Sequence, residues 1–101
     1  MKVVFSERAR TDIGSIYDEI AQHNAAAALR VEAAIRSACD WLADFPFAAV
    51  ATDEPNVRRL PLVRYPYTIF YRVDGSRDLV EIARVIHGAR VRNLRRLPLE
   101  E

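Results

Sequence analysis

Two β-prone runs separated by a short turn constrain the fold of this chain more than any other feature. Residues 67–73 and 79–86 alternate with a period of two, which is the period of a β-strand. Asp74, Gly75 and Ser76 lie between them and are typical of a turn, because Gly tolerates φ > 0 and Asp bonds its own backbone. We therefore predict a hairpin. Both strands are nearly apolar on both faces, which indicates strands in the middle of a sheet.

The alternation also predicts which side chains of the hairpin share a face. On the first strand these are Tyr67, Ile69, Tyr71 and Val73. On the second strand they are Val80, Ile82, Arg84 and Ile86. If this face is buried, the charge of Arg84 requires an acidic partner, either in this chain or in another protein.

Two helices are predicted before the hairpin. Residues 2–5 form a short β-prone run, and Ser6 is a suitable N-cap for a helix that extends to about Gln22. Asn24 is the expected cap of a second helix, which Pro46 ends at or just before Phe45. Each helix carries an apolar stripe at helical spacing, as in two antiparallel helices packed together. The stripes are Ile13, Ile16, Tyr17 and Ile20, then Val31, Ile35, Ala38, Leu42 and Phe45.

The remaining segments complete an α+β order. Residues 47–56 read as a loop, and residues 57–60 as a short strand at an edge because Pro61 follows. The predicted order is β-α-α-β-β-β: an N-terminal strand, a helical hairpin and a three-stranded antiparallel meander. At 101 residues the chain is expected to form a single domain, residues 1–101, with 91–101 as a basic C-terminal tail.

Composition excludes several classes of protein. Half of the residues are hydrophobic, which argues against disorder, and no apolar run approaches the roughly 18 residues of a membrane span. We expect no signal peptide, because the chain turns polar after its first five residues. One cysteine, Cys39, excludes an internal disulfide and suits a reducing cytoplasm. One cysteine and two distant histidines form no recognisable metal motif, so we expect no metal and no cofactor.

Charge is distributed unevenly along the chain. Residues 1–56 hold five basic and nine acidic residues, a net charge of −4, whereas residues 57–101 hold ten basic and five acidic residues, a net charge of +5. All ten basic residues of the second part are arginines. Guanidinium groups bind carboxylates and phosphates through paired hydrogen bonds, so this part suits an acidic protein segment or a nucleic-acid backbone.

Several sequence blocks resemble toxins of the ParE/RelE superfamily, which belong to bacterial type II toxin–antitoxin modules. The blocks follow one another along nearly the whole chain. They are Ser6-Glu7-Arg8-Ala9, Arg59-Leu60-Pro61, Tyr65-Pro66-Tyr67, Ile69-Phe70-Tyr71-Arg72-Val73 and Ile82-Ala83-Arg84-Val85-Ile86-His87-Gly88-Ala89-Arg90. The last three, in this order and spacing, are typical of the ParE-like branch.

The resemblance implies a RelE/ParE-like fold, a cytoplasmic location and an antitoxin partner. For the ParE branch it implies growth arrest by inhibition of DNA gyrase, and a role in plasmid stabilisation. For the RelE branch it implies cleavage of mRNA on the ribosome. A third possibility is a degenerate toxin that serves its antitoxin in binding operator DNA.

The residues for RNA cleavage are incomplete in this sequence. The reaction needs a base, an acid and cations for the developing phosphorane charge. Arg84, His87 and Arg90 are the candidates, but no lysine lies in the sheet region and no tyrosine follows residue 71. Arginine stays protonated and is therefore a poor base. We accordingly predict no catalytic residues and a toxin that acts by binding.

Arginines are the predicted contact residues of such a binder. A groove between the helical hairpin and the sheet, with an arginine rim, is expected to receive an amphipathic helix or an added strand of the antitoxin. The predicted antitoxin contacts are Arg58, Arg59, Arg64, Arg72 and Arg84. The predicted target contacts are Arg90, Arg92, Arg95 and Arg96.

Overall fold

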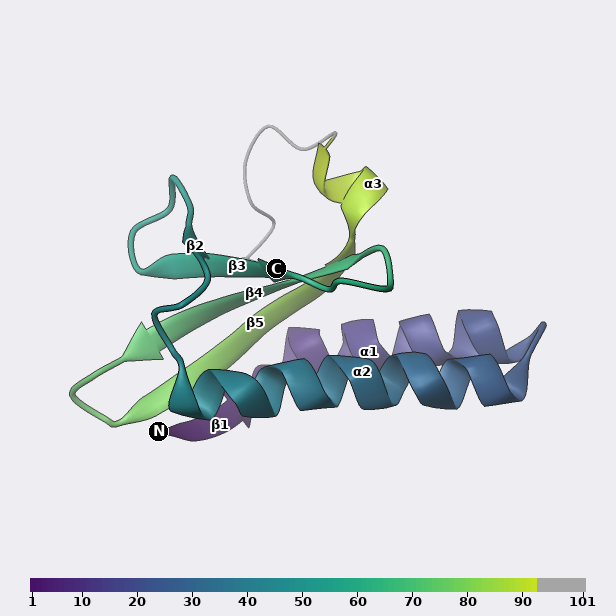
Figure 1. Cartoon of the computed structure of the whole chain (residues 1–101), viewed down its shortest axis with the longest axis horizontal. Helices are drawn as coiled ribbons and strands as arrows, with labels where there is room; N and C mark the ends of the chain where they lie inside the picture. Colours follow the sequence, from purple (N-terminus) through teal and green to yellow (C-terminus); the bar gives the residue numbers. More distant parts are fainter. Residues whose placement is uncertain (93–101) are drawn as a thin grey trace.

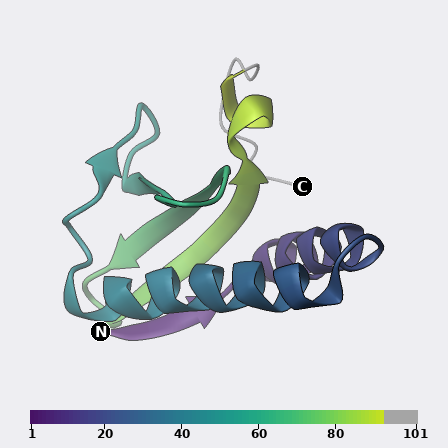
Figure 2. The same ribbon diagram turned by 45° about the vertical axis from the view of Figure 1, so that its right-hand side comes forward.

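A helical hairpin lies along one side of a five-stranded sheet in the computed structural model, which describes residues 1–92 (Figure 1). The strands are β1 (Lys2–Phe5), β2 (Val50–Ala51), β3 (Val57–Pro61), β4 (Tyr67–Asp74) and β5 (Leu79–His87). The helices are α1 (Glu7–Ala21), α2 (Ala25–Asp44) and α3 (Gly88–Arg92). Figure 2 shows α3 continuing from the end of β5, on the far side of the sheet from the helical hairpin of α1 and α2. None of the described helices is long and apolar enough to cross a bilayer.

The sheet has the order β1-β5-β4-β3-β2, and only the β1–β5 pair is parallel. The predicted α+β class and its β-α-α-β-β-β order are confirmed. The structure adds the two-residue strand β2 within the predicted loop and the short helix α3. A parallel pair requires a long crossover connection, and the helical hairpin supplies it together with the meander.

Both predicted caps are present. Ser6 Oγ accepts a hydrogen bond from Ala9 N at 3.0 Å and donates one to Ala83 O at 2.9 Å. Asn24 Oδ1 accepts from Ala27 N at 3.0 Å. Each side chain satisfies one of the free N–H groups at the start of its helix. Ser6 thereby also fixes the first turn of α1 to β5.

The β4–β5 turn uses a different residue from the one predicted for its left-handed position. No glycine among the described residues has positive φ, whereas Asp78 has φ 54°. The prediction for Gly75 was therefore wrong. Asp78 is the last of the four turn residues, 75–78, and its short polar side chain tolerates the left-handed conformation. Asp74 Oδ1 does accept from Ser76 Oγ at 2.8 Å and Arg77 N at 3.2 Å, and the Ser76 bond lowers the pKa of that carboxyl.

A β-bulge in β5 changes the predicted face of its last residues. Phe70 pairs with Arg84 and Tyr71 pairs with Ile82, so Ala83 is the extra residue. Val80, Ile82 and Val85 consequently pack into the main core beneath the helices. Ile86 packs with Val57 and Phe70 in a separate, smaller cluster, which corrects the predicted face of Ile86.

Candidate functional site

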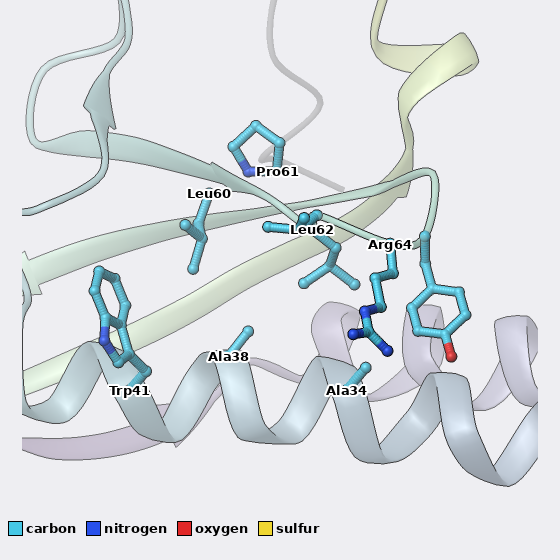
Figure 3. A pocket seen from close by; sticks show the side chains of 9 residues that line it. Ala34, Ala38, Trp41, Leu60, Pro61, Leu62 and Arg64 are labelled. Atoms are coloured by element: carbon cyan, nitrogen blue, oxygen red, sulfur yellow. The ribbon is translucent and has the colours of Figure 1, made fainter.

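An apolar groove lies between α2 and the segment that joins β3 to β4. Its volume is about 470 Å³. The lining residues are Ala34, Ala38, Trp41, Leu60, Pro61, Leu62, Val63, Arg64 and Tyr65. Figure 3 shows Leu60 and Leu62 opposite Ala38 and Ala34 of the helix, with Trp41 and Arg64 toward opposite ends. The small alanines, one turn apart, leave the space that makes the groove. We refer to these nine residues as the apolar groove.

Exposed aromatic side chains extend the apolar surface beyond Trp41. The rings of Trp41 and Phe45 stack with their centroids 5.1 Å apart, and Phe45 is 51% exposed. Phe45 was predicted on the buried stripe of α2, and this prediction was wrong because the helix ends before it. Val63 is fully exposed at the rim. Exposed apolar residues that adjoin a groove make it a candidate binding surface.

Arg58 and Tyr71 fix the chain that follows α2. Arg58 Nη1 donates to Phe47 O at 3.2 Å and to Ala49 O at 2.8 Å, and its guanidinium lies 5.3 Å from the centre of the Phe47 ring. Tyr71 Oη donates to Pro46 O at 2.8 Å. Burial raises the pKa of the Tyr71 hydroxyl. The exposed aromatic surface is thus held in place from the sheet.

Arg84 is buried and paired within the chain. Its Nε donates to Asp12 Oδ2 at 2.7 Å and its Nη2 donates to Asp12 Oδ1 at 3.1 Å. Val85 N donates to the same Asp12 Oδ2 at 3.0 Å. The Arg84 side chain is 2% exposed and that of Asp12 is 11% exposed. The sequence predicted that a buried Arg84 needs an acidic partner, and the structure identifies this partner as Asp12.

A second, polar cleft lies between α1 and the ends of β4 and β5. Its volume is about 310 Å³. Asp12, Ser15, Ile16 and Glu19 line it from α1, and Tyr67, Val85, Ile86, His87 and Arg90 line it from the sheet and α3. We refer to these nine residues as the polar cleft. It brings together His87 and Arg90, two of the three residues considered for catalysis.

Local contacts orient His87 in this cleft. His87 Nδ1 accepts from Ala89 N at 3.1 Å, and the His87 and Tyr67 rings meet edge to face with centroids 5.4 Å apart. A neutral imidazole that accepts at Nδ1 carries its proton on Nε2. Burial, with a smaller contribution from the charge of Glu19, raises the pKa of the Tyr67 hydroxyl.

Comparison with known proteins identifies the family. The family model of the ParE toxin of the type II toxin–antitoxin system parDE matches residues 3–92. The chain belongs to the ParE/RelE toxin family. Toxin RelE2 of Caulobacter vibrioides is 38% identical over 92 residues, which are 89% of this toxin and 98% of the relative.

Solved structures agree with this assignment. The chromosomal ParDE toxin–antitoxin system of P. aeruginosa contains a chain with a TM-score of 0.75 and 26% identity, covering 86% of this toxin and 95% of that chain. The toxin–antitoxin complex RelBE2 of Mycobacterium tuberculosis gives a TM-score of 0.62 at 22% identity, covering 85% and 95%. The second likeness shows the fold alone.

The predicted antitoxin contacts of the toxin lie in different places. Arg64 lines the apolar groove, and Arg59 is exposed on β3. Arg72 forms a half-exposed ion pair with Glu81 across the hairpin, at 3.2 Å. Arg58 and Arg84 hold other parts of the toxin, as described above. Their roles in binding remain predictions.

Of the predicted target contacts, only Arg90 can be placed. It is exposed beside the polar cleft. Arg92 is the last residue of α3, and its side chain lies outside the described part, as do Arg95 and Arg96.

Sequence reasoning missed Asp12, Glu19 and the groove face of α2. Ala34, Ala38 and Trp41 recur at helical spacing, so the sequence could have predicted that they share one face of α2. Asp12 and Glu19 carry no such signal, because only the folded sheet brings them to β5.

Proposed function

We propose that this toxin arrests growth by binding DNA gyrase in the cytoplasm, without catalysing a reaction, and that a cognate antitoxin neutralises it. The observation that carries the proposal is the composition of the polar cleft. Arg84 is engaged by Asp12, and the carboxylate of Glu19 lines the same cleft as His87 and Arg90. A carboxylate beside a phosphorane would oppose its negative charge, whereas a binder needs only a complementary surface.

The proposed antitoxin surface is the apolar groove. Its length along α2, its lining of small and aliphatic side chains and the arginine at one end suit the apolar face of an amphipathic helix. An acidic residue of that helix would meet Arg64. The proposal also includes binding to operator DNA, by the toxin and the antitoxin together as one complex.

The proposed target surface is the arginine-rich end of the toxin. Arg90 is exposed next to the cleft, and Arg92, Arg95 and Arg96 follow it in sequence. Positive charges clustered in this way attract an acidic protein face or DNA held by an enzyme.

Plasmid supercoiling by purified gyrase, titrated with the toxin freed of its antitoxin, tests the proposal. We expect inhibition with accumulation of cleaved plasmid, reversed by the antitoxin. Arg90→Glu should weaken inhibition at least tenfold. Arg77→Glu is the matched control, because Arg77 is exposed at the opposite end of the hairpin. A folded toxin that stops cell growth but leaves gyrase unaffected would contradict the proposal.

Cleavage of mRNA on the ribosome is the second candidate. The specific observation in its favour is that His87, whose Nδ1 accepts from Ala89 N, lines one cleft with Arg90. A translation extract programmed with a defined mRNA tests it: new 5′ ends that appear only with toxin and ribosomes would establish cleavage and displace the gyrase proposal.

A further inference from the structure

The apolar groove has charges of opposite sign at its two ends. Arg64 lies at the end beside Ala34 (Figure 3), and Arg30 is one turn further along the same face of α2. Asp44 follows Trp41 by three residues and therefore lies on that face beyond the other end. All three charged residues are exposed. We refer to the Arg30 and Arg64 end as the basic end and to the Asp44 end as the acidic end.

The charges at both ends are available to a partner. The described residues form ion pairs at other positions, and none of these pairs involves Arg30, Asp44 or Arg64. Arg58 contacts the chain after α2, near the acidic end, but its guanidinium donates to two backbone carbonyls of that chain. The opposite charges of the two ends are thus a property of the groove surface.

Asp44 lies at an unfavourable place in the free toxin. It is the last residue of α2, and the last turn of this helix contains no basic side chain. The C-terminal end of a helix carries partial negative charge from its unpaired carbonyls, so a carboxylate there is repelled and a cation is favoured. The amino group of Met1 relieves part of this charge by donating to Ala43 O at 2.9 Å. A positive group of a partner beside Asp44 would relieve more of it.

We propose that the antitoxin helix lies in the apolar groove antiparallel to α2, with its N-terminus at Asp44 and its C-terminus at Arg64 and Arg30. This inference rests on the proposed function, because it assigns a direction to the helix that was proposed to occupy the groove. A helix carries about half a positive charge at its N-terminus and about half a negative charge at its C-terminus. In the antiparallel direction both ends meet opposite charge, whereas in the parallel direction both ends meet like charge.

The positions of these charges define the chemistry of the partner. Residues 30 and 44 are about 21 Å apart along α2 at 1.5 Å per residue, a distance that a helix of about 14 residues spans. The first turn of this helix would present its free backbone N–H groups, or a basic side chain, to Asp44. Its last turn would carry an acidic side chain that binds Arg64 or Arg30.

The exposed aromatic surface lies where the antitoxin chain would enter the groove. Trp41 and Phe45 stack with their ring centroids 5.1 Å apart, next to the acidic end. In the proposed direction, the residues that precede the antitoxin helix pass over these rings. An apolar side chain in that segment would cover them, because large aromatic rings contribute strongly to interfaces.

The two ends of the groove should contribute to affinity independently. Their separation exceeds the distance of about 8 Å over which exposed charges interact at physiological salt. A charge beside a helix end typically contributes about two- to fivefold in affinity at an exposed site. Each end can therefore be tested by itself.

Neutral substitutions at the two ends test the direction by the sign of their effect. We expect Asp44→Asn and Arg64→Gln each to weaken binding of the purified cognate antitoxin at least twofold. The parallel direction predicts the opposite sign, because each charge would then repel the helix end beside it. Asp18→Asn, at an exposed position of α1, is the matched control and should leave the affinity unchanged. Unchanged or tighter binding by either variant would overturn the inference.

Disulfide cross-linking locates the two ends of the antitoxin helix directly. Asp44→Cys and Arg30→Cys each introduce one exposed thiol, whereas the native Cys39 is buried. Each variant is combined with an antitoxin that carries a cysteine in the first or in the last turn of its helix. A disulfide forms only where the two Cα atoms lie within about 7 Å. We expect Asp44→Cys to cross-link to the first turn and Arg30→Cys to the last turn.

The four combinations separate this inference from the proposed function. Cross-links of the reverse pairing would overturn the direction and leave the groove as the antitoxin surface. Absence of every cross-link in a fully formed complex would overturn both the direction and the groove assignment. If the expected pairs form while the toxin leaves gyrase unaffected in the supercoiling assay, the gyrase proposal fails and the direction stands.

Discussion

Asp12 of α1 and Arg84 of β5 form a buried ion pair, with Nε and Oδ2 2.7 Å apart. The same carboxylate also accepts the Val85 N–H directly after the β5 bulge. Asp12 therefore satisfies three donors of a strand that is distant in sequence, and it fixes α1 against the part of β5 that β1 does not cover. The pair belongs to the core of the toxin. Arg90, in contrast, is exposed and lines the polar cleft.

Removal of one partner of this pair should destabilise the toxin strongly. Asp12→Ala removes the carboxylate that pairs with the buried Arg84 guanidinium, and the loss of one member of a buried ion pair typically costs about 3–5 kcal/mol of unfolding free energy. Asp18→Ala, on an exposed position of the same helix, should stay within about 0.5 kcal/mol. Urea denaturation of both variants measures the difference. A loss below about 1 kcal/mol for Asp12→Ala would show that water reaches Arg84 in the variant.

The sequence predicted that Arg84 needs a partner but could not name it. Alternation placed Arg84 on an apolar strand face, where a lone charge is unfavourable. The bulge at Ala83, however, changes the alternation, and bulges have no dependable sequence signal in a run without Gly. The element order, both N-caps and the hairpin were predictable, because each depends on local periodicity or capping chemistry. The contact between α1 and β5 is not local.

Substitutions at Gly75 and Asp78, in the β4–β5 turn, should have opposite effects on the stability of the toxin. Gly75 does not have positive φ, and a Cβ added there meets no atom within 4 Å. Gly75→Ala should therefore stabilise the toxin by about 0.4–1 kcal/mol, by restricting the unfolded chain. Asp78→Ala should destabilise it by about 1 kcal/mol, because φ at Asp78 is positive.

Thermal unfolding of the two turn variants, with Asp78→Gly as the control, measures these effects. Gly adopts positive φ without steric cost, so Asp78→Gly should be at least as stable as Asp78→Ala. The reverse order of the two Asp78 variants would mean that the turn changes conformation when the aspartate is lost.

The Cys39 thiol should make stability fall at alkaline pH. Burial, with a smaller effect of Asp40, raises the pKa of this thiol from 9.0 to about 12. The thiol is neutral in both states below pH 9, and above pH 9 only the unfolded chain loses the proton. Stability is thus fully present below pH 9 and falls between pH 9 and 12, by up to about 1.4 kcal/mol per pH unit from this group.

Urea denaturation at pH 8 and pH 10.5 measures this slope, and Cys39→Ala is the comparison. Cys39→Ala loses packing at every pH and is therefore less stable throughout. The comparison is between the slopes of unfolding free energy against pH in the two proteins. Burial also raises the pKa values of Tyr67 and Tyr71, and these remain in both proteins. An identical slope with and without Cys39 would show that the thiol does not titrate on unfolding in this range.

His87→Ala should separate the two candidate targets in cells. A gyrase binder needs no proton transfer, so the variant should retain toxicity within about twofold. A nuclease that uses His87 as acid or base would lose about 10²–10⁴-fold in cleavage rate. Growth after induction, with protein abundance measured in parallel, distinguishes the two. Complete loss of toxicity in a variant that accumulates and folds would count against the gyrase proposal.

The apolar groove should be testable with a single exposed residue. Val63 is fully exposed at its rim, so Val63→Asp has little effect on folding but puts a charge where an apolar helix face would pack. We expect antitoxin affinity to fall at least tenfold, or about 1.4 kcal/mol. Leu29→Asp is the matched control, because Leu29 is 58% exposed on α2 and does not line the groove. Calorimetric titration of both variants measures the effect; equal losses would indicate that the antitoxin covers a much wider surface of α2 than the groove.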